Sequence, residues 1–213
     1  DRNNDGGYGG AISGMGMSDA GNQVAFNKLI DNTSSNDYIA ASGYLQYEPI
    51  KGLIVKFNAS RNMYFGKTRL FKPTYEIGSA KRNTMASLSE ARTQTTNDLL
   101  ELTANYDKTI AEQHNLSLLL GLSLEENKYD DLSASGSDFE NNDMSLMGHA
   151  KSNYSVGGTK TRSALRSLFG RVNYNYMMRY MIMASFRYDG SSRFAKGNKW
   201  GFFPSVSLAL SLI

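Results

Sequence analysis

The stretch "HNLSLLLGLSLEEN" (residues 114–127) decides the fold class, because its apolar residues recur with a period of two. One side carries a leucine at every second position, namely Leu116, Leu118, Leu120, Leu122 and Leu124. The opposite side carries Ser117, Leu119, Gly121, Ser123 and Glu125. Successive side chains of a β-strand point to opposite faces, so this alternation indicates a strand with one apolar face and not a helix, whose period is 3.6.

Six further stretches show the same period, at residues 37–49, 52–60, 97–107, 167–176, 180–188 and 205–213. The connections between the seven strands alternate in length. Short ones are expected at 48–52, 108–113 and 177–179, long polar ones at 67–94 and 131–164, and an intermediate one at 189–201. Short periplasmic turns facing long extracellular loops are typical of transmembrane barrels, whereas a soluble sandwich turns every 8 to 12 residues or so. The pattern predicts an all-β protein: an antiparallel transmembrane β-barrel wall of about seven strands.

Composition and charge exclude several other classes. Hydrophobic residues make up 40% and charged residues 20%, which is ordinary for a folded chain and argues against disorder. The net charge of +3 comes from scattered lysines and arginines, so no nucleic-acid partner is expected. The absence of cysteine excludes disulfides and thiolate metal sites. No apolar run is long enough for a membrane-spanning helix, but membrane-spanning strands are compatible with the pattern.

Aromatic residues gather toward the predicted strand ends. Aromatic girdles occupy the two membrane interfaces of barrels, although tyrosine also favours strands in general. The residues concerned are Tyr44, Tyr47, Tyr64, Phe65, Tyr174, Tyr176, Tyr180, Tyr188, Trp200, Phe202 and Phe203. With the alternation of the connections, their positions favour girdles.

From residue 165 onward four features follow one another over about 45 residues: "LFGRVNYNY", a short turn, "RYDGSSRF" and "WGFFPSVS". In these motifs and their order the chain resembles the SusC/RagA family of TonB-dependent outer-membrane transporters. Met177 and Met178 depart from the polar turn residues usual in the family, and "LALSLI" departs from the usual end of its strand. Residues 1–164 match in strand and loop character only.

This resemblance implies a function for a parent protein of which the 213 residues are expected to be a part. It implies a 22-stranded barrel in the bacterial outer membrane, in contact with its lipid, with residues 1–37 as an extracellular loop and 38–213 as barrel strands and loops. A plug domain and a TonB box are expected outside this chain, with TonB and a SusD-like surface lipoprotein as partners. The implied activity is import of an oligosaccharide or peptide, with no cofactor and no enzymatic reaction. A passive porin or structural barrel, and a soluble carbohydrate-binding β-sandwich, are the alternatives.

The "RYDGSSRF" motif is expected to be a structural loop that stiffens the barrel rim, with substrate contact as the alternative. Asp and Gly supply turn chemistry, and serines can bond nearby backbone. An ion pair between Asp189 and Arg193 is expected across the loop. The family-motif residues are Arg187, Asp189, Gly190, Ser191, Ser192, Arg193, Phe194, Trp200, Gly201 and Pro204.

Polar residues opposite the apolar face are candidates for lining the lumen. They are Arg171, Asn173, Asn175, Arg187, Glu101, Asn105 and Glu125. Such residues either border the path of a substrate or hydrogen-bond the plug, and the sequence leaves both uses open. Arg61 instead falls on the apolar face, where a charge at mid-membrane costs about 2–4 kcal/mol, so it is expected at or above the outer rim.

Metal and catalytic signals are weak. Asp1, Asn3 and Asp5 match the opening of a calcium loop, but Ile12 stands where the bidentate glutamate belongs, so a solvated turn is the favoured interpretation. His114 and His149 lie far apart with no zinc-type spacing. No nucleophile or P-loop motif occurs, so enzyme activity has no support.

Overall fold

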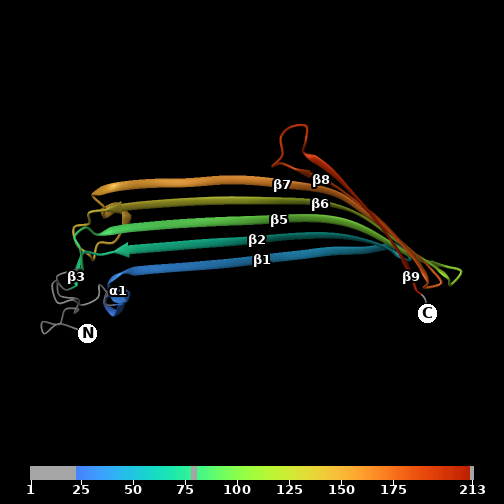
Figure 1. Cartoon of the computed structure of the whole chain (residues 1–213), viewed down its shortest axis with the longest axis horizontal. Coiled ribbons are helices and arrows are strands. Elements are labelled where there is room, and N and C mark those ends of the chain that lie inside the picture. Colours follow the sequence, from blue (N-terminus) through green and yellow to red (C-terminus); the bar gives the residue numbers. More distant parts are fainter. Residues whose placement is uncertain (1–22, 78–80, 212–213) are drawn as a thin grey trace. The chain divides into compact units, whose positions relative to one another are not determined.

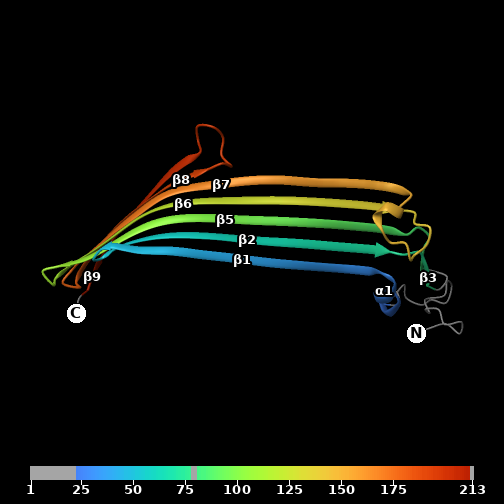
Figure 2. The same cartoon turned by 180° about the vertical axis from the view of Figure 1, so that it is seen from behind.

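The protein was analysed as a computed structural model, which describes residues 23–77 and 81–211. Its main element is a seven-stranded antiparallel sheet in the order β1-β2-β5-β6-β7-β8-β9, which confirms the predicted fold class. The strands lie side by side in that order when viewed from either side (Figure 1, Figure 2). They are β1 (Asp31–Ile50), β2 (Leu53–Lys72), β5 (Ser87–Ile110), β6 (His114–Ser137), β7 (Ser152–Tyr176), β8 (Tyr180–Ser191) and β9 (Trp200–Leu210).

Smaller elements accompany the sheet. They are the helix α1 (Gln23–Leu29), the two-stranded ribbon of β3 (Tyr75–Ile77) and β4 (Lys81–Asn83), and the 3-10 turn η1 (Met147–His149). Among the described residues no helix is long and apolar enough to cross a membrane. Within the described ranges the other sheet is the ribbon of β3 and β4, which is too small to form the second layer of a β-sandwich.

Three predicted short connections are tight turns. The chain reverses at residues 51–52, 111–113 and 177–179. Gly52 adopts a φ of 86° in the first, and Met177 and Met178 have φ values of 53° and 56° in the third. Turns with positive φ at both central residues match the right-handed twist of the flanking strands, which explains why this conformation occurs here even without glycine.

The strands extend further than the apolar alternation predicted. Residues 67–94 and 131–164 were expected to be long connections, but β2 and β5 occupy half of the first and β6 and β7 more than half of the second. Only 73–86 and 138–151 join these strands. Residues 31–37, expected in a loop, belong to β1. A strand with water on both sides still pairs its backbone groups but needs no apolar face, so periodicity does not reveal it.

Contacts within the chain group its residues into two units. Of the described residues, the loop-side unit contains those up to Asp37 and those within Tyr64–Gln94 and Asp130–Lys160. The turn-side unit contains Tyr38–Met63, Thr95–Tyr129 and the described residues from Thr161 onward.

The loop-side unit has a small core of its own. Phe71, Ala86, Leu88, Phe139 and Ala150 are buried together, and the rings of Phe71 and Phe139 meet edge to face at 5.5 Å. Apolar burial of this kind fixes the long connections in place, because an ordered loop must offset its lost conformational entropy.

The turn-side unit separates apolar and polar side chains onto two faces of one sheet. Register shows this directly: Val172 lies opposite Ala184, which lies opposite Val206, while Asn173 lies opposite Met183, which lies opposite Ser207. We call the side with Leu116, Leu118, Leu120, Leu122 and Leu124 the apolar face, and the other the polar face. The leucines Leu120, Leu122 and Leu124 are half exposed, as expected of a surface made to contact lipid.

Candidate functional site

All seven residues predicted to line a lumen fall on the polar face of the turn-side unit, but they do not form one cluster. Glu101 accepts a hydrogen bond from Asn58 at 3.4 Å, and Asn105 donates one to Asp107. Arg171 and Glu125 are exposed, and neither makes a hydrogen bond or ion pair within the described ranges. The remaining three residues lie in two distinct places.

Asn173 and Asn175 border a groove at the turn end of the polar face. The groove has a volume of about 520 Å³, and its other walls include Asn115, Ser117 and Met183. The amide nitrogen of Asn175 donates to the sulfur of Met178 at 3.0 Å, and its Oδ1 is buried with no hydrogen-bond partner among the described residues. A buried acceptor without a donor costs about 1–3 kcal/mol, so this atom is suited to receive a donor from outside the sheet.

Arg187 is the centre of a polar cluster further along the same face. Its Nε donates to both carboxylate oxygens of Asp189 at 2.8 Å, and its Nη2 donates to the hydroxyl of Ser167 at 2.9 Å. The guanidinium carbon lies 5.7 Å from the centre of the Phe169 ring. Three side chains therefore hold that of Arg187, and because Ser167 and Phe169 belong to β7, Arg187 links β8 to β7.

The serines that follow tie the loop to β7. Ser192 donates its backbone N–H to the Ala164 carbonyl and accepts the Ala164 N–H on its hydroxyl, at 2.9 and 2.8 Å. Ser191 accepts the backbone N–H of Arg193 at 3.3 Å, as predicted for turn chemistry. The expected pairing of Asp189 with Arg193 is wrong, because Arg187 holds Asp189 and Arg193 donates to Ser163 at 3.3 Å.

Two further motif residues, Gly190 and Trp200, pack against each other. They are direct partners in the ladder of β8 and β9, and the indole stacks on Tyr188 with ring centres 4.8 Å apart. A Cβ built on Gly190 would lie 2.6 Å from the indole, so only glycine leaves room for the ring. Gly201 and Pro204 lie on β9 opposite Asp189 and Phe186, and the Phe194 side chain is exposed.

The predicted girdle residues divide between the two faces. Tyr174 and Tyr176 pack against His114, whose Nδ1 lies 2.6 Å from the Tyr174 hydroxyl, and Tyr180 stacks on Tyr176. This cluster is at the turn end of the apolar face. Tyr188, Trp200 and Phe202 form a second group on that face. Phe203 lies opposite Arg187, on the polar face. Tyr44 lies beneath Lys56, also on the polar face. These two therefore do not belong to a girdle.

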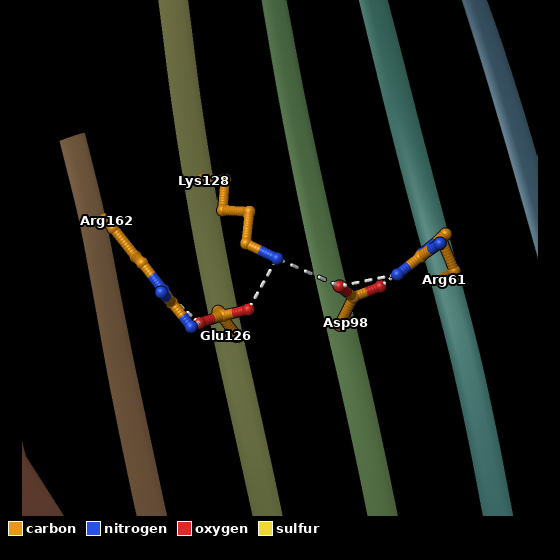
Figure 3. A network of polar contacts seen from close by, with 5 residues as sticks. All are labelled: Arg61, Asp98, Glu126, Lys128 and Arg162. Carbon is orange, nitrogen blue, oxygen red and sulfur yellow. Dashed lines mark hydrogen bonds and ion pairs between the residues drawn. The ribbon is translucent and has the colours of Figure 1, made fainter. Parts of the chain in front are cut away.

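Sequence reasoning missed a row of charges on the apolar face. Figure 3 shows Arg61, Asp98, Glu126, Lys128 and Arg162 linked across four strands. Of these residues, only Arg61 was singled out from the sequence, and its expected location at or above the outer rim stays a prediction. Asp98 and Glu126 lie two positions from Leu100 and Leu124, on the same face of their strands. The alternation that placed Arg61 on the apolar face therefore places these two carboxylates there as well.

The loop-side unit contains a second cluster that the sequence did not indicate. Arg69 pairs with Asp31 and with Glu90, the latter at 3.3 Å, and donates to the carbonyl and hydroxyl of Ser145 at 2.7 Å. It thereby links three strands to the connection 138–151. Nearby on β6 and β7, Asp130 raises the pKa of Lys160 through an ion pair at 2.6 Å.

The weak calcium candidates Asp1, Asn3 and Asp5 lie outside the described residues. Within the described part of the chain, no group of three or more acidic or histidine side chains is arranged to hold a metal ion.

Comparisons with known proteins identify relatives along most of the chain. TonB-dependent receptor P3 of Formosa agariphila is 35% identical over 189 residues, which is 86% of this chain and 18% of the relative. TonB-dependent receptor P39 of the same species is 32% identical over 191 residues, 87% of this chain and 17% of the relative. TonB-dependent receptor SusC of Bacteroides thetaiotaomicron is 54% identical over 48 residues, 22% of this chain and 5% of the relative. No family model matches the chain.

Solved structures agree with these relatives. The RagAB peptide transporter matches with a TM-score of 0.84 at 24% identity, over 93% of this chain and 22% of that one. The RagAB peptide importer in its open-open state matches with a TM-score of 0.83 at 26% identity, over 92% of this chain and 22% of that one. The chain thus spans about a fifth of the length of these proteins.

The sheet of the chain matches part of a barrel, and the three relatives named above are TonB-dependent receptors. TonB-dependent receptors are outer-membrane transporters and not enzymes. The chain therefore belongs to the SusC/RagA family of TonB-dependent receptors, and its seven strands are part of the family's barrel wall.

Proposed function

We propose that the full-length protein imports a peptide or an oligosaccharide across the outer membrane, using energy delivered by TonB. The observation that carries this proposal is the two-faced sheet of the turn-side unit, with an apolar face for lipid and a polar face for a lumen. Its supports are the names of the relatives and the likeness to a peptide transporter of the same barrel type.

The polar face has two roles in this proposal. The groove beside Asn173 and Asn175 contacts the plug, because the unpartnered Oδ1 of Asn175 needs a donor and lies near the short turns, on the side that the family places in the periplasm. Arg171 and Glu125 are exposed charges on the same face and border the path of the substrate.

A SusD-like surface lipoprotein completes the proposed importer. The support is indirect: the solved structures that match are RagAB complexes, and the strands of the loop-side unit form an ordered platform around Phe71 and Arg69 on which a lid could rest. The proposed partner binds the loops that join these strands, including 73–86 and 138–151.

Uptake by cells with and without the full-length gene tests the proposal. Labelled peptides and labelled oligosaccharides are supplied to the parent strain, to a deletion strain and to a strain with an inactivated TonB system. We expect one substrate class to enter only when both the gene and TonB function are present. Uptake that needs the gene but not TonB would establish a passive porin instead.

The partner is tested by purification. The full-length protein, extracted in detergent with an affinity tag in a loop outside 73–86 and 138–151, is expected to carry a lipoprotein encoded close to it. Loss of that lipoprotein on replacement of segment 138–151 by a flexible linker, with transporter yield unchanged, would locate the contact. An unchanged lipoprotein yield would refute the proposed docking site.

A further inference from the structure

The charged row on the apolar face is a continuous network. Arg61 pairs with Asp98 through two hydrogen bonds, of 2.5 and 3.0 Å. Lys128 lies 2.6 Å from Glu126 and 3.8 Å from Asp98, and Arg162 also pairs with Glu126. As Figure 3 shows, the residues come from β2, β5, β6 and β7, so the row crosses four adjacent strands.

The network presents its cations outward. The carboxylates of Asp98 and Glu126 are 22% exposed, whereas the side chains of Arg61 and Arg162 are 58% and 70% exposed and that of Lys128 is 46% exposed. Two covered carboxylates thus orient three cations, each of which keeps donors free toward the outside. Arg166, exposed and with no ion pair among the described residues, adds a fourth cation on the same face. The accessible surface of this row is therefore cationic.

Two observations locate the row at the end of the lipid-facing band. From Leu116 to Glu126 there are ten residue steps. At about 3.4 Å per residue and a strand tilt of about 40°, they correspond to a height of roughly 26 Å, close to the ~25 Å of an apolar band. Arg166 is also the ladder partner of Gly190, whose other partner is the girdle residue Trp200. The row is thus at the interface opposite the short turns, in the outer leaflet.

A groove adjoins the cations on the apolar face. Its volume is about 660 Å³, and its floor is made by small residues, Ala41, Gly43, Ala59 and Ala164. Leu100 and Leu124 supply apolar lining, and Arg61 and Arg166 line the groove together with the carboxylate residues Asp98, Glu125 and Glu126. Asp98 and Glu126 are neutralised by the cations of the row. An apolar trough that ends in guanidinium groups is complementary to a hydrocarbon chain attached to an anionic headgroup.

We propose that this row and groove bind a phosphorylated lipid of the outer leaflet, with a phosphate on the guanidinium groups of Arg61, Arg162 and Arg166 and an acyl chain in the groove. Guanidinium binds phosphate oxygens through paired N–H donors, and basic clusters at a membrane surface select anionic headgroups. The inference rests on the location of the barrel in the outer membrane and not on its transport activity.

A purely structural network would explain the ion pairs but not the direction of the side chains. If cross-strand pairing were the only role, the arginines would need no greater exposure than their carboxylate partners, and Arg166 would need no place beside them. The excess of two cations over two covered carboxylates, next to a groove of small residues, is the feature that calls for an anionic occupant.

Native mass spectrometry of the full-length protein tests the proposal. The protein is purified in detergent, delipidated and titrated with bis-phosphorylated lipid A, with the same lipid after removal of its phosphates, and with inorganic phosphate. The double variant Arg61→Gln/Arg162→Gln removes two cations of the row. Its control is Lys56→Gln/Arg179→Gln, which removes one cation from the polar face and one from the turn 177–179. We expect at least a roughly tenfold loss of lipid A affinity in the first variant only.

A second variant separates binding from folding. Asp98→Asn/Glu126→Gln removes the covered carboxylates and leaves the cations, so affinity for lipid A is expected to hold or rise while thermal stability stays the same or falls. Loss of stability in the arginine variant without loss of lipid affinity would overturn the proposal. Equal affinity for the dephosphorylated lipid, or tight binding of inorganic phosphate alone, would overturn it as well. A photo-crosslinker at position 162 that reacts in cells with a polypeptide rather than with lipid would assign the surface to a protein.

Discussion

Replacement of Gly190 by alanine is expected to destabilise the barrel through one ring. The new Cβ would lie 2.6 Å from two carbon atoms of Trp200 and 2.7 Å from a third, well inside van der Waals contact. The backbone at Gly190 does not require a positive φ, so the effect is steric and not conformational. The indole must move, and its stack on Tyr188 is lost.

The magnitude follows from opposing contributions. Overpacking costs about 1–3 kcal/mol and the lost aromatic pair about 0.5–1.5 kcal/mol, while alanine recovers about 0.4–1 kcal/mol because the unfolded chain has less freedom. The free energy of unfolding should fall by about 1–3 kcal/mol. Gly43→Ala is the matched control, since nothing lies within 4 Å of its built Cβ, and it should be neutral or slightly stabilising.

A double-mutant cycle in the full-length protein provides the decisive assay. Urea-induced unfolding in detergent is measured for the wild type, Gly190→Ala, Trp200→Ala and the double variant. Because the clash needs the indole, Gly190→Ala should cost almost nothing in the Trp200→Ala background. A cost that is the same in both backgrounds would refute the steric reasoning.

Three further predictions concern a turn, an ion pair and a core. Met178→Gly should stabilise the turn by about 0.5–1 kcal/mol, as a higher urea midpoint, because glycine adopts the φ of 56° without strain. Arg187→Gln should cost about 1 kcal/mol by the same measurement, since it removes the pair with Asp189. Phe139→Ala should cost about 3 kcal/mol locally by opening the core around Phe71, seen as faster proteolysis within 138–151 at unchanged barrel stability.

Each of these predictions has an outcome that contradicts it. An unchanged or lower midpoint for Met178→Gly would show that the turn is not strained. If Arg187→Lys, which keeps the charge without the planar fork, restored no stability, the contact with Asp189 would not be the cause. Proteolysis of segment 138–151 at the wild-type rate would show that Phe139 does not hold the connection.

Period-two alternation was a sufficient guide to the faces of the turn-side unit. The registers of β7, β8 and β9 place Val172, Ala184 and Val206 on one side, as their spacing alone predicted. This works because side-chain direction in a strand is a local property, set by the residue's own position in the pleat. The short turns were equally predictable, because loop length restricts the chain to few geometries.

The strand ends were not predictable in the same way. Between Phe65 and Lys72, and again before Thr95, both sides of the strands are polar or mixed, and only hydrogen bonds to neighbouring strands keep the backbone extended. The core of Phe71, Leu88 and Phe139 was not predictable either, because it joins residues that are far apart in the chain. Non-local pairing leaves no period in a single sequence.

Residues 114–127 and the motifs after residue 165 therefore determined by themselves the fold class, the two faces and the family. Only the tertiary structure decided which charges meet: Asp189 binds Arg187 and not Arg193, and Arg61 is one member of a row that runs to Arg162. Which face a side chain occupies depends on its own strand, whereas its partner depends on the register of the strand beside it. That register is set jointly by the turn and by the burial pattern of both strands, so one strand's sequence does not reveal it.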